Sequence, residues 1–227
     1  MLMPSSPGRS EPEMRTKARN KVERIPKRGH YDAPTIHGIL DSACIAHVSF
    51  ADAGGQPFVI PMLYAREGEC LYLHGSIASR LMKTVGSGIA ACACVTLVDG
   101  LVLARSHFHH SMNYRSVVVF GTAEPVTDAS EKAAILARFV DAILPGRAAE
   151  ARAADRNELK ATSLLRFHIE QASAKIRSGG PKDDPADATL PIWSGVVPIA
   201  QRHAEPIAAE DATPGVPVPA SVLRLLD

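Results

Sequence analysis

The sequence predicts a mainly β fold with helices, of the α+β class, built on about six to seven antiparallel strands. Short runs of alternating or continuous apolar residues follow one another between residues 44 and 122. Turn residues such as Asp52, Gly54 and Gly55 separate these runs. Helical patterns do not alternate regularly with them, which favours an antiparallel barrel or sheet over a doubly wound parallel sheet.

The first half of the chain contains one predicted helix and three strands. Pro34 suits the first turn of a helix at residues 31–41, where Ile36, Ile39 and Leu40 recur at helical spacing. Residues 44–50 alternate from one face to the other, as in a strand. Turns then lead into strands at 58–64 and 70–74, which gives a three-stranded meander.

Pro61 lies inside the second of these strands. Proline cannot donate to a sheet ladder, so it is confined to edges, bulges and strand starts. The run at 58–64 is therefore either a plain edge strand or a strand with one side left open for a ligand.

The second half of the chain is predicted to contain two helices and four strands. Ser76 is a good N-cap for a short helix that carries Ile77, Leu81 and Val85 and ends at Gly86 and Gly88. Strands are predicted at 89–98, 102–107 and 114–122. Asp128 caps a long amphipathic helix that stops at residues 145–146, and an alanine-rich connector at 147–160 leads to a last strand at 163–176.

Composition shifts divide the chain into three parts. Residues 1–23 form a basic N-terminal arm that we expect to be flexible, and residues 24–180 form the compact domain. Residues 181–227 are rich in proline and alanine, but the stretch 190–199 is apolar and contains Trp193, the single tryptophan. We expect that stretch to dock on the domain.

Charge and cysteine usage narrow the function classes. The formal charge is +1, from 25 basic and 24 acidic side chains, so there is no general field for nucleic acid or acidic membranes. No apolar run approaches the length of a membrane span, and the first residues lack a secretory signal. Cys44, Cys70, Cys92 and Cys94 lie in strand-like runs without metal-ligand spacing. We expect a cytoplasmic protein with reduced thiols and no metal site.

The strongest local pattern is a strand, a small-residue turn and a helix between His74 and Lys83. A helix start presents free N–H groups, and Ser79, Arg80 and Lys83 add a hydroxyl and two cations, which suits a phosphate monoester. A capped helix with exposed cations has the same pattern, so both interpretations stay open on these residues. The glycines match neither a dinucleotide nor a triphosphate loop.

The order of the Gly-containing hairpin, the Ser79-Arg80 turn and the later run YRSVVVFGTAE at 114–124 resembles a known family. It is similar to the FMN-binding split barrel of the pyridoxamine 5'-phosphate oxidase-like superfamily, above all its nitroimidazole-resistance and flavin-nucleotide-binding branch. The resemblance covers about residues 24–198. It implies FMN as cofactor and a homodimer with flavin in the interface.

The resemblance also assigns roles to single residues. The backbone of Val59, Ile60, Pro61, Met62 and Leu63 would run beside the isoalloxazine ring. His74 and Gly75 would flank the ribityl chain, and Ser79 and Arg80 would hold the phosphate. The oxidase proper has a lysine directly after that arginine, but Leu81 stands here, so Lys83 is the substitute. Ser116 would reach toward the flavin, and Trp193 would come from the partner subunit or else pin the tail to its own core.

Two features bear on the reaction. The oxidase proper has an arginine motif for the substrate phosphate after the terminal tryptophan, but SGVVP follows here, which argues against pyridoxamine phosphate as substrate. No general acid or base stands out. His109 is the candidate nearest to such a role, whereas His107 and His110 suit either a polar loop or a metal or haem ligand, and His47 suits a sheet position.

These observations give one leading hypothesis and its rivals. The chain is expected to bind FMN and to act as a flavin-dependent oxidoreductase on a small, unidentified substrate. The rivals are a non-catalytic flavin carrier or sensor and a haem-binding relative that uses a histidine near the same cleft.

Overall fold

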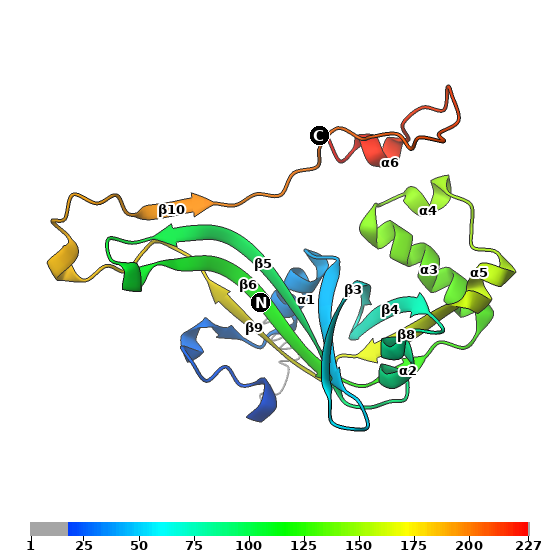
Figure 1. Cartoon of the computed structure of the whole chain (residues 1–227), viewed down its shortest axis with the longest axis horizontal. Coiled ribbons are helices and arrows are strands. Elements are labelled where there is room, and N and C mark those ends of the chain that lie inside the picture. Colours follow the sequence, from blue (N-terminus) through cyan, green and yellow to red (C-terminus); the bar gives the residue numbers. More distant parts are fainter. Residues whose placement is uncertain (1–17, 227) are drawn as a thin grey trace, which may run out of the picture.

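The computed structural model of the chain describes residues 18–226 and shows a strongly curved antiparallel sheet with helices around it (Figure 1). Ten strands of the described residues pair in the order β1-β9-β6-β5-β2-β3-β4-β8-β7, and β10 pairs with β5. The strands are β1 Gly29–His30, β2 Ile45–Ala51, β3 Pro57–Glu67, β4 Cys70–Ser76, β5 Ala91–Leu103, β6 Ser111–Gly121, β7 Ala123–Pro125, β8 Thr162–His168, β9 Gln171–Arg177 and β10 Gly195–Pro198.

The helices are short apart from one. They are α1 Ala33–Asp41, α2 Arg80–Val85, α3 Ala129–Ile143, α4 Arg147–Glu150, α5 Arg156–Ala161 and α6 Ala220–Leu223, with 3₁₀ turns η1 Ala18–Asn20, η2 Pro26–Arg28, η3 His107–His109 and η4 Pro185–Asp187. None of the helices in the described range is long and apolar enough to cross a membrane.

The sheet curls into a split barrel without closing. Strands β8 and β9 lie near opposite ends of the strand order, yet only Ile169 and Glu170 separate them in the chain. The sheet must therefore bend until its two ends meet at this corner. The predicted α+β split-barrel class is confirmed, although residues 18–226 form ten strands instead of the expected six or seven.

The core fills the inside of the curl. Alternate residues of the strands point inward, for example Ala46 and Val48 of β2 and Val117 and Val119 of β6, and all four are almost fully buried. Helix α1 closes one end with Ile36, Ile39 and Leu40, the residues whose spacing predicted it. A second, smaller core lies between α3 and β4, around Ile135, Phe139 and Tyr72.

Three predicted boundaries are wrong. The helix expected from Ser76 begins at Arg80, because Ser76 still pairs with Thr162 at the end of β4 and Ser79 caps the helix. The two strands expected at 89–98 and 102–107 are one strand, β5, with a bulge at Asp99. Arg115 binds the Asp99 carboxylate, with its Nη2 2.8 Å from Oδ1, so Asp99 and Gly100 bend the strand instead of ending it.

The third wrong boundary concerns the last strand. The run predicted as one strand at 163–176 is split into β8 and β9 at the corner described above. The corner is very tight, because a Cβ on Gly121 would lie 1.8 Å from the carbonyl oxygen of His168. Glycine is therefore required at residue 121, where β6 ends against β8.

Two terminal segments lie over the barrel. The predicted flexible arm covers residues 1–23, of which 1–17 lie outside the described residues. In its described part, Arg19 donates to the side chains of Gln171 and Glu170, and buried Asn20 donates to the carbonyl of Ala172, so this part is held on β9. At the other end, β10 extends the long β5–β6 hairpin, which projects from the barrel as an arm (Figure 1).

Residues 199–219, which we call the strap, run from β10 back across the molecule to α6 (Figure 1). The strap is exposed along almost its whole length. Its far end is fixed because the Ser221 hydroxyl donates to Glu150 of α4 and Arg224 donates to the carbonyl of Pro145, at 2.9 Å. The strap is thus anchored at both ends and free between them.

We predict that Gly121→Ala lowers the free energy of unfolding by about 1 to 3 kcal/mol, the usual cost of overpacking, or prevents folding. Gly38 in α1 is the matched control, because a Cβ there meets nothing within 4 Å. Gly38→Ala should raise the free energy by about 0.5 to 1 kcal/mol, since glycine weakens a helix interior. Urea unfolding of both variants tests this, and an unchanged midpoint for Gly121→Ala contradicts the tight corner.

Candidate functional site

Strand β3 has an open edge over most of its length. Its partner β2 pairs with residues 57–63, but β4 joins on the other side only from Tyr64 to Glu67. The backbone N–H of Tyr64 donates to the carbonyl of Cys44 at 3.0 Å, so Pro61 falls in a non-hydrogen-bonded pair with His47. The missing N–H of Pro61 therefore faces the open edge and costs the ladder nothing.

The side chains of this edge strand divide between two faces. Ile60 and Met62 point inward and pack against the core. Val59, Pro61 and Leu63 point outward, with Val59 62% exposed. We call this side the outer face of the sheet. Of the five residues predicted to run beside the flavin ring, two are core residues that offer a ligand only their backbone.

The β4–α2 turn places a cation beside β3. The Ser79 hydroxyl accepts from the N–H of Met82 at 3.5 Å and caps α2. The Arg80 guanidinium lies 4.7 Å from the ring centre of Phe58, so α2 is linked to the start of the open edge. Among residues 18–226, no carboxylate forms an ion pair with Arg80 or Lys83. Two unpaired cations and an open strand edge therefore lie close together.

His74 and Gly75 point to opposite sides of β4. The His74 imidazole packs edge-on against Phe139 of α3, with ring centres 4.4 Å apart, and its Nδ1 is buried without a hydrogen-bond partner. Burial lowers the pKa of His74, which favours the neutral ring. A Cβ on Gly75 would lie 3.2 Å from Cγ of Met82, so this glycine lets α2 approach the strand. The His74 side chain is thus directed toward α3, on the side of β4 opposite to Gly75 and α2.

Ser116 and Trp193 do not join this group within one protomer. Ser116 lies on the outer face beside Thr96, and its hydroxyl donates to the carbonyl of Lys175 at 3.3 Å. Trp193 is 65% exposed and covers Gly195 at the start of β10. Figure 1 places β10 and α2 at opposite sides of the molecule, so Trp193 of the same chain does not reach Arg80.

The histidine run at 107–110 forms the turn η3 at the tip of the arm. His109 Nε2 lies 3.9 Å from Asp184, and Phe108 is 89% exposed. His110 Nδ1 lies 2.8 Å from the carbonyl oxygen of Ser106. Within the described range no three His, Cys, Asp or Glu side chains are grouped to hold a metal ion. His109, the candidate for a catalytic role, is therefore remote from the β3–α2 region in its own chain.

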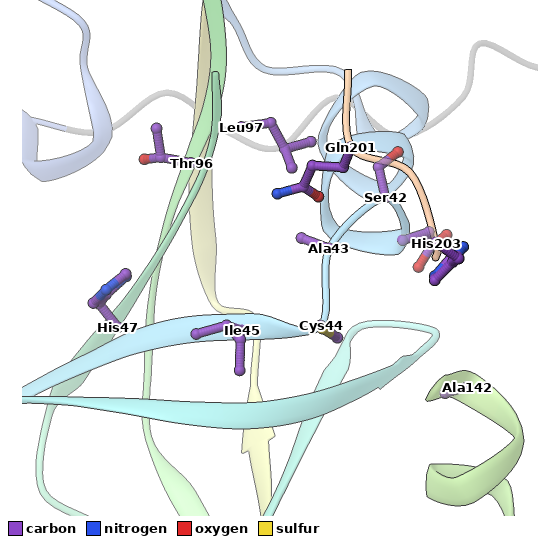
Figure 2. A pocket seen from close by; sticks show the side chains of 11 residues that line it. Ser42, Ala43, Cys44, Ile45, His47, Thr96, Leu97, Ala142, Gln201 and His203 are labelled. Carbon is purple, nitrogen blue, oxygen red and sulfur yellow. The ribbon is translucent and has the colours of Figure 1, made fainter. Parts of the chain in front are cut away.

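A cavity of about 440 Å³ lies between the outer face and the strap, and sequence analysis did not find it (Figure 2). Strand β2 pairs with β5 only at His47, Val48 and Ser49, while β10 pairs with β5 from Gly100 onward. The cavity lies between these two paired regions, where β2 and β5 are no longer hydrogen-bonded to each other. It is lined by Asp41, Ser42, Ala43, Cys44, Ile45, His47, Thr96, Leu97, Ala142, Gln201 and His203.

Figure 2 shows how this strap cavity is built. His47 and Ile45 stand on β2 along one wall, whereas Gln201 and His203 come from the strap near Ser42. The strap brings residues 201 and 203 to the same cavity as residues 41–47, and no local pattern encodes its path. The sequence gives no signal that sets Gln201 and His203 apart, because the strap contains other polar and charged residues such as Arg202 and Glu205.

Comparison with known proteins identifies the barrel. A family model described as pyridoxamine 5'-phosphate oxidase matches residues 32–176. The chain belongs to this family. The match spans α1 to β9 and so includes the open edge, the β4–α2 turn and the sheet wall of the strap cavity, while β10 and the strap lie beyond it.

The likeness to two solved structures extends past that boundary. The flavocytochrome Anf3 from Azotobacter vinelandii is 38% identical, with a TM-score of 0.85 over 93% of this chain and 98% of its own. An FAD and haem binding protein from Mycobacterium smegmatis is 34% identical, with a TM-score of 0.83 over 88% of this chain and 97% of its own. The predicted membership of the oxidase-like family is confirmed.

A more distant structure shares the barrel alone. A 5-nitroimidazole antibiotic resistance protein from Bacteroides thetaiotaomicron, described as putative, is 21% identical, with a TM-score of 0.57 over 65% of this chain and 86% of its own. At that identity the likeness shows the fold only. No curated protein matches the chain.

Proposed function

We propose that this member of the pyridoxamine 5'-phosphate oxidase family is a redox protein that binds both a flavin and a haem. The observation that carries the proposal is the likeness to the flavocytochrome Anf3, which extends over 93% of this chain and 98% of the other. Likeness over this length takes in residues beyond the family barrel. The FAD and haem binding protein from Mycobacterium smegmatis supports the same pair of cofactors.

The β3–α2 region fits a flavin. The open edge at 57–63 offers backbone N–H and C=O groups to the polar rim of an isoalloxazine ring. Arg80 and Lys83 have no carboxylate partner in the described structure, so their charge is available to a phosphate. Pro61 leaves no unsatisfied donor at this edge. We propose that Val59, Pro61 and Leu63 lie along the ring and that Ser79, Arg80 and Lys83 hold the phosphate.

The flavin proposed is FAD and not the FMN expected from the sequence. The relative from Mycobacterium smegmatis is described as an FAD binding protein and shares 34% of its residues over 97% of its length. FAD contains the whole of FMN, so the same residues would meet the ring and the first phosphate in either case. Mass analysis of the released flavin separates the two.

The two elements proposed to hold the flavin supply no acid–base side chain of their own. Residues 57–63 and α2 contain neither a carboxylate nor an imidazole. When bound, flavin and haem supply one-electron chemistry, and the residues of the site would bind and orient the ring. This favours an electron-transfer role over the predicted flavin-dependent oxidation of a small, unidentified substrate.

The first prediction concerns the cofactors themselves. Freshly purified protein should absorb both in the flavin region and at a Soret maximum, and denaturation should release FAD and haem, identified by mass. A yellow protein without a Soret band, even after incubation with hemin, contradicts the haem half. A protein that takes up neither added FAD nor FMN contradicts the flavin half.

Arg80→Ala is predicted to weaken flavin binding by about 1.5 to 3 kcal/mol, because a charge-assisted hydrogen bond to the phosphate is lost. Arg138 provides a matched control: it is an exposed arginine on α3 paired with Glu67, away from the open edge. Flavin titration followed by fluorescence quenching measures both variants. Equal affinities for Arg80→Ala, Arg138→Ala and the unchanged chain would remove the phosphate assignment.

The protein is also proposed to be a homodimer. The arm carries exposed apolar residues on three adjacent strands, Leu101 of β5, Met112 of β6 and Val197 of β10, each at least 39% exposed. Phe108 at its tip is 89% exposed. A projecting arm with apolar sides is typical of an element that packs on another subunit, and in a dimer it would carry Trp193 and His109 toward the partner's open edge.

Sedimentation equilibrium should therefore give twice the chain mass of 24.2 kDa. Leu101→Glu should shift the equilibrium toward monomer, because it buries a charge in the proposed interface. Ile207→Glu is the control, since Ile207 is 96% exposed in the strap. A monomeric unchanged chain, or equal dissociation of the two variants, contradicts the dimer or the role of the arm.

A further inference from the structure

We propose that the strap cavity is the haem site and that His47 is the iron ligand. This inference rests on the haem half of the proposed function and adds to it a place and a ligand. Three independent features support it: the cavity itself, the position of His47 in the sheet, and the charge balance of the cavity wall.

The cavity has the size and lining of a cofactor site. Its volume of about 440 Å³ lies within the usual range of ligand pockets. Ala43, Ile45, Leu97 and Ala142 provide apolar surface suited to the face of a porphyrin. Ser42, Gln201 and His203 add polar groups beside the strap (Figure 2). The lining therefore combines an apolar wall with a polar side, as an amphipathic planar ligand requires.

The charges of the cavity lining are also compatible with a haem and its two propionates. The acidic residue of the lining is Asp41, and both of its oxygens accept from Arg66, at 2.7 Å for the Nε–Oδ1 bond. The hydrogen bond to Asp41 raises the pKa of Arg66 above its usual value, so a charged guanidinium lies against this carboxylate. No uncompensated carboxylate in the lining would repel the two propionates of a haem.

His47 is the histidine best placed to bind iron. It lies in β2 between two paired strands, opposite Pro61 of β3 and Cys94 of β5. The backbone on both sides fixes its position, while its side chain is exposed on the outer face. It forms no ion pair or hydrogen bond with the other described residues. An imidazole on a rigid strand, facing a cavity, could bind the iron of a haem.

The other histidines near this face are less suitable. His203 lies on the strap, in a run of exposed residues that is fixed only at its two ends. His110 lies at the tip of the arm, and its Nδ1 contacts the carbonyl of Ser106, outside the cavity lining. We therefore place His203 at the cavity's strap wall without an iron bond, and His110 outside the site.

The register of β2 and β3 relates this site to the flavin region. His47 and Pro61 are directly opposite each other in a non-hydrogen-bonded pair, in which the Cβ atoms lie about 4.5 to 5.5 Å apart. Their side chains stand on the same outer face. A haem bound to His47 would thus be a neighbour of a flavin lying along Val59, Pro61 and Leu63. The strap would close the opposite side of the haem site.

The experiment compares full-length variants purified from cells supplied with haem precursor. Haem per chain is measured by the pyridine haemochrome method and flavin per chain by release. His47→Ala should reduce haem content by about tenfold or shift its Soret band, as expected when a metal site loses a ligand interaction. Its flavin content should remain, and added imidazole should restore the original band. His203→Ala and His110→Ala should keep the original band.

A cavity-filling pair tests the site without touching the ligand. Ala142 is an exposed residue of α3 that lines the cavity, and Ala134 is an exposed residue of the same helix that does not. Ala142→Trp should lower haem content while flavin content and melting temperature stay close to those of Ala134→Trp. Equal haem content in these two variants overturns the cavity assignment.

The possible outcomes distinguish a failure of haem binding from a failure of the ligand assignment. If the unchanged chain binds no haem, the haem half of the proposed function fails, and this inference fails with it. If the unchanged chain binds haem but His47→Ala keeps its band and content, the proposed function stands and the ligand assignment is overturned. Loss of the band in His110→Ala instead would place the haem at the arm.

Discussion

Strands β2 and β3 pair extensively with each other, but each pairs with its other neighbour over only a few residues. The two strands form seven residue pairs with each other, yet β2 forms three with β5 and β3 forms four with β4. Each early separation leaves backbone groups without a sheet partner. On one side this gives the open edge beside Arg80, and on the other it gives the strap cavity beside His47. Both candidate sites therefore follow from one constraint on the sheet.

The strap, which follows β10, forms the wall of the cavity that the barrel itself does not provide. The β5–β6 hairpin continues past the bulge at Asp99, whose carboxylate is held by Arg115. That extension gives β10 a strand to pair with, and β10 sets the starting point of the strap.

Local patterns were sufficient for most of the barrel and for the helix that carries Arg80 and Lys83. The spacing of Ile36, Ile39 and Leu40 predicted α1, and Pro61 indicated a strand with one side unpaired, which β3 has over residues 57–63. Ser76 was misread because its capping chemistry is the same in a strand end as in a helix start, and only the pairing with Thr162 decides between them. The strap cavity was missed because it joins residues 41–47 to residues 201–203 through tertiary contacts.

The strap has a consequence for how such chains can diverge. It is a connection with fixed ends, since β10 holds one end and the bonds from Ser221 and Arg224 hold the other. The entropy of closing a loop grows slowly, by about 0.6 kcal/mol for each doubling of length. Insertions and deletions between the two anchors should therefore accumulate at little cost in stability. The strap wall of the cavity can thus change its length and sequence in evolution while the β2 and β5 wall stays the same.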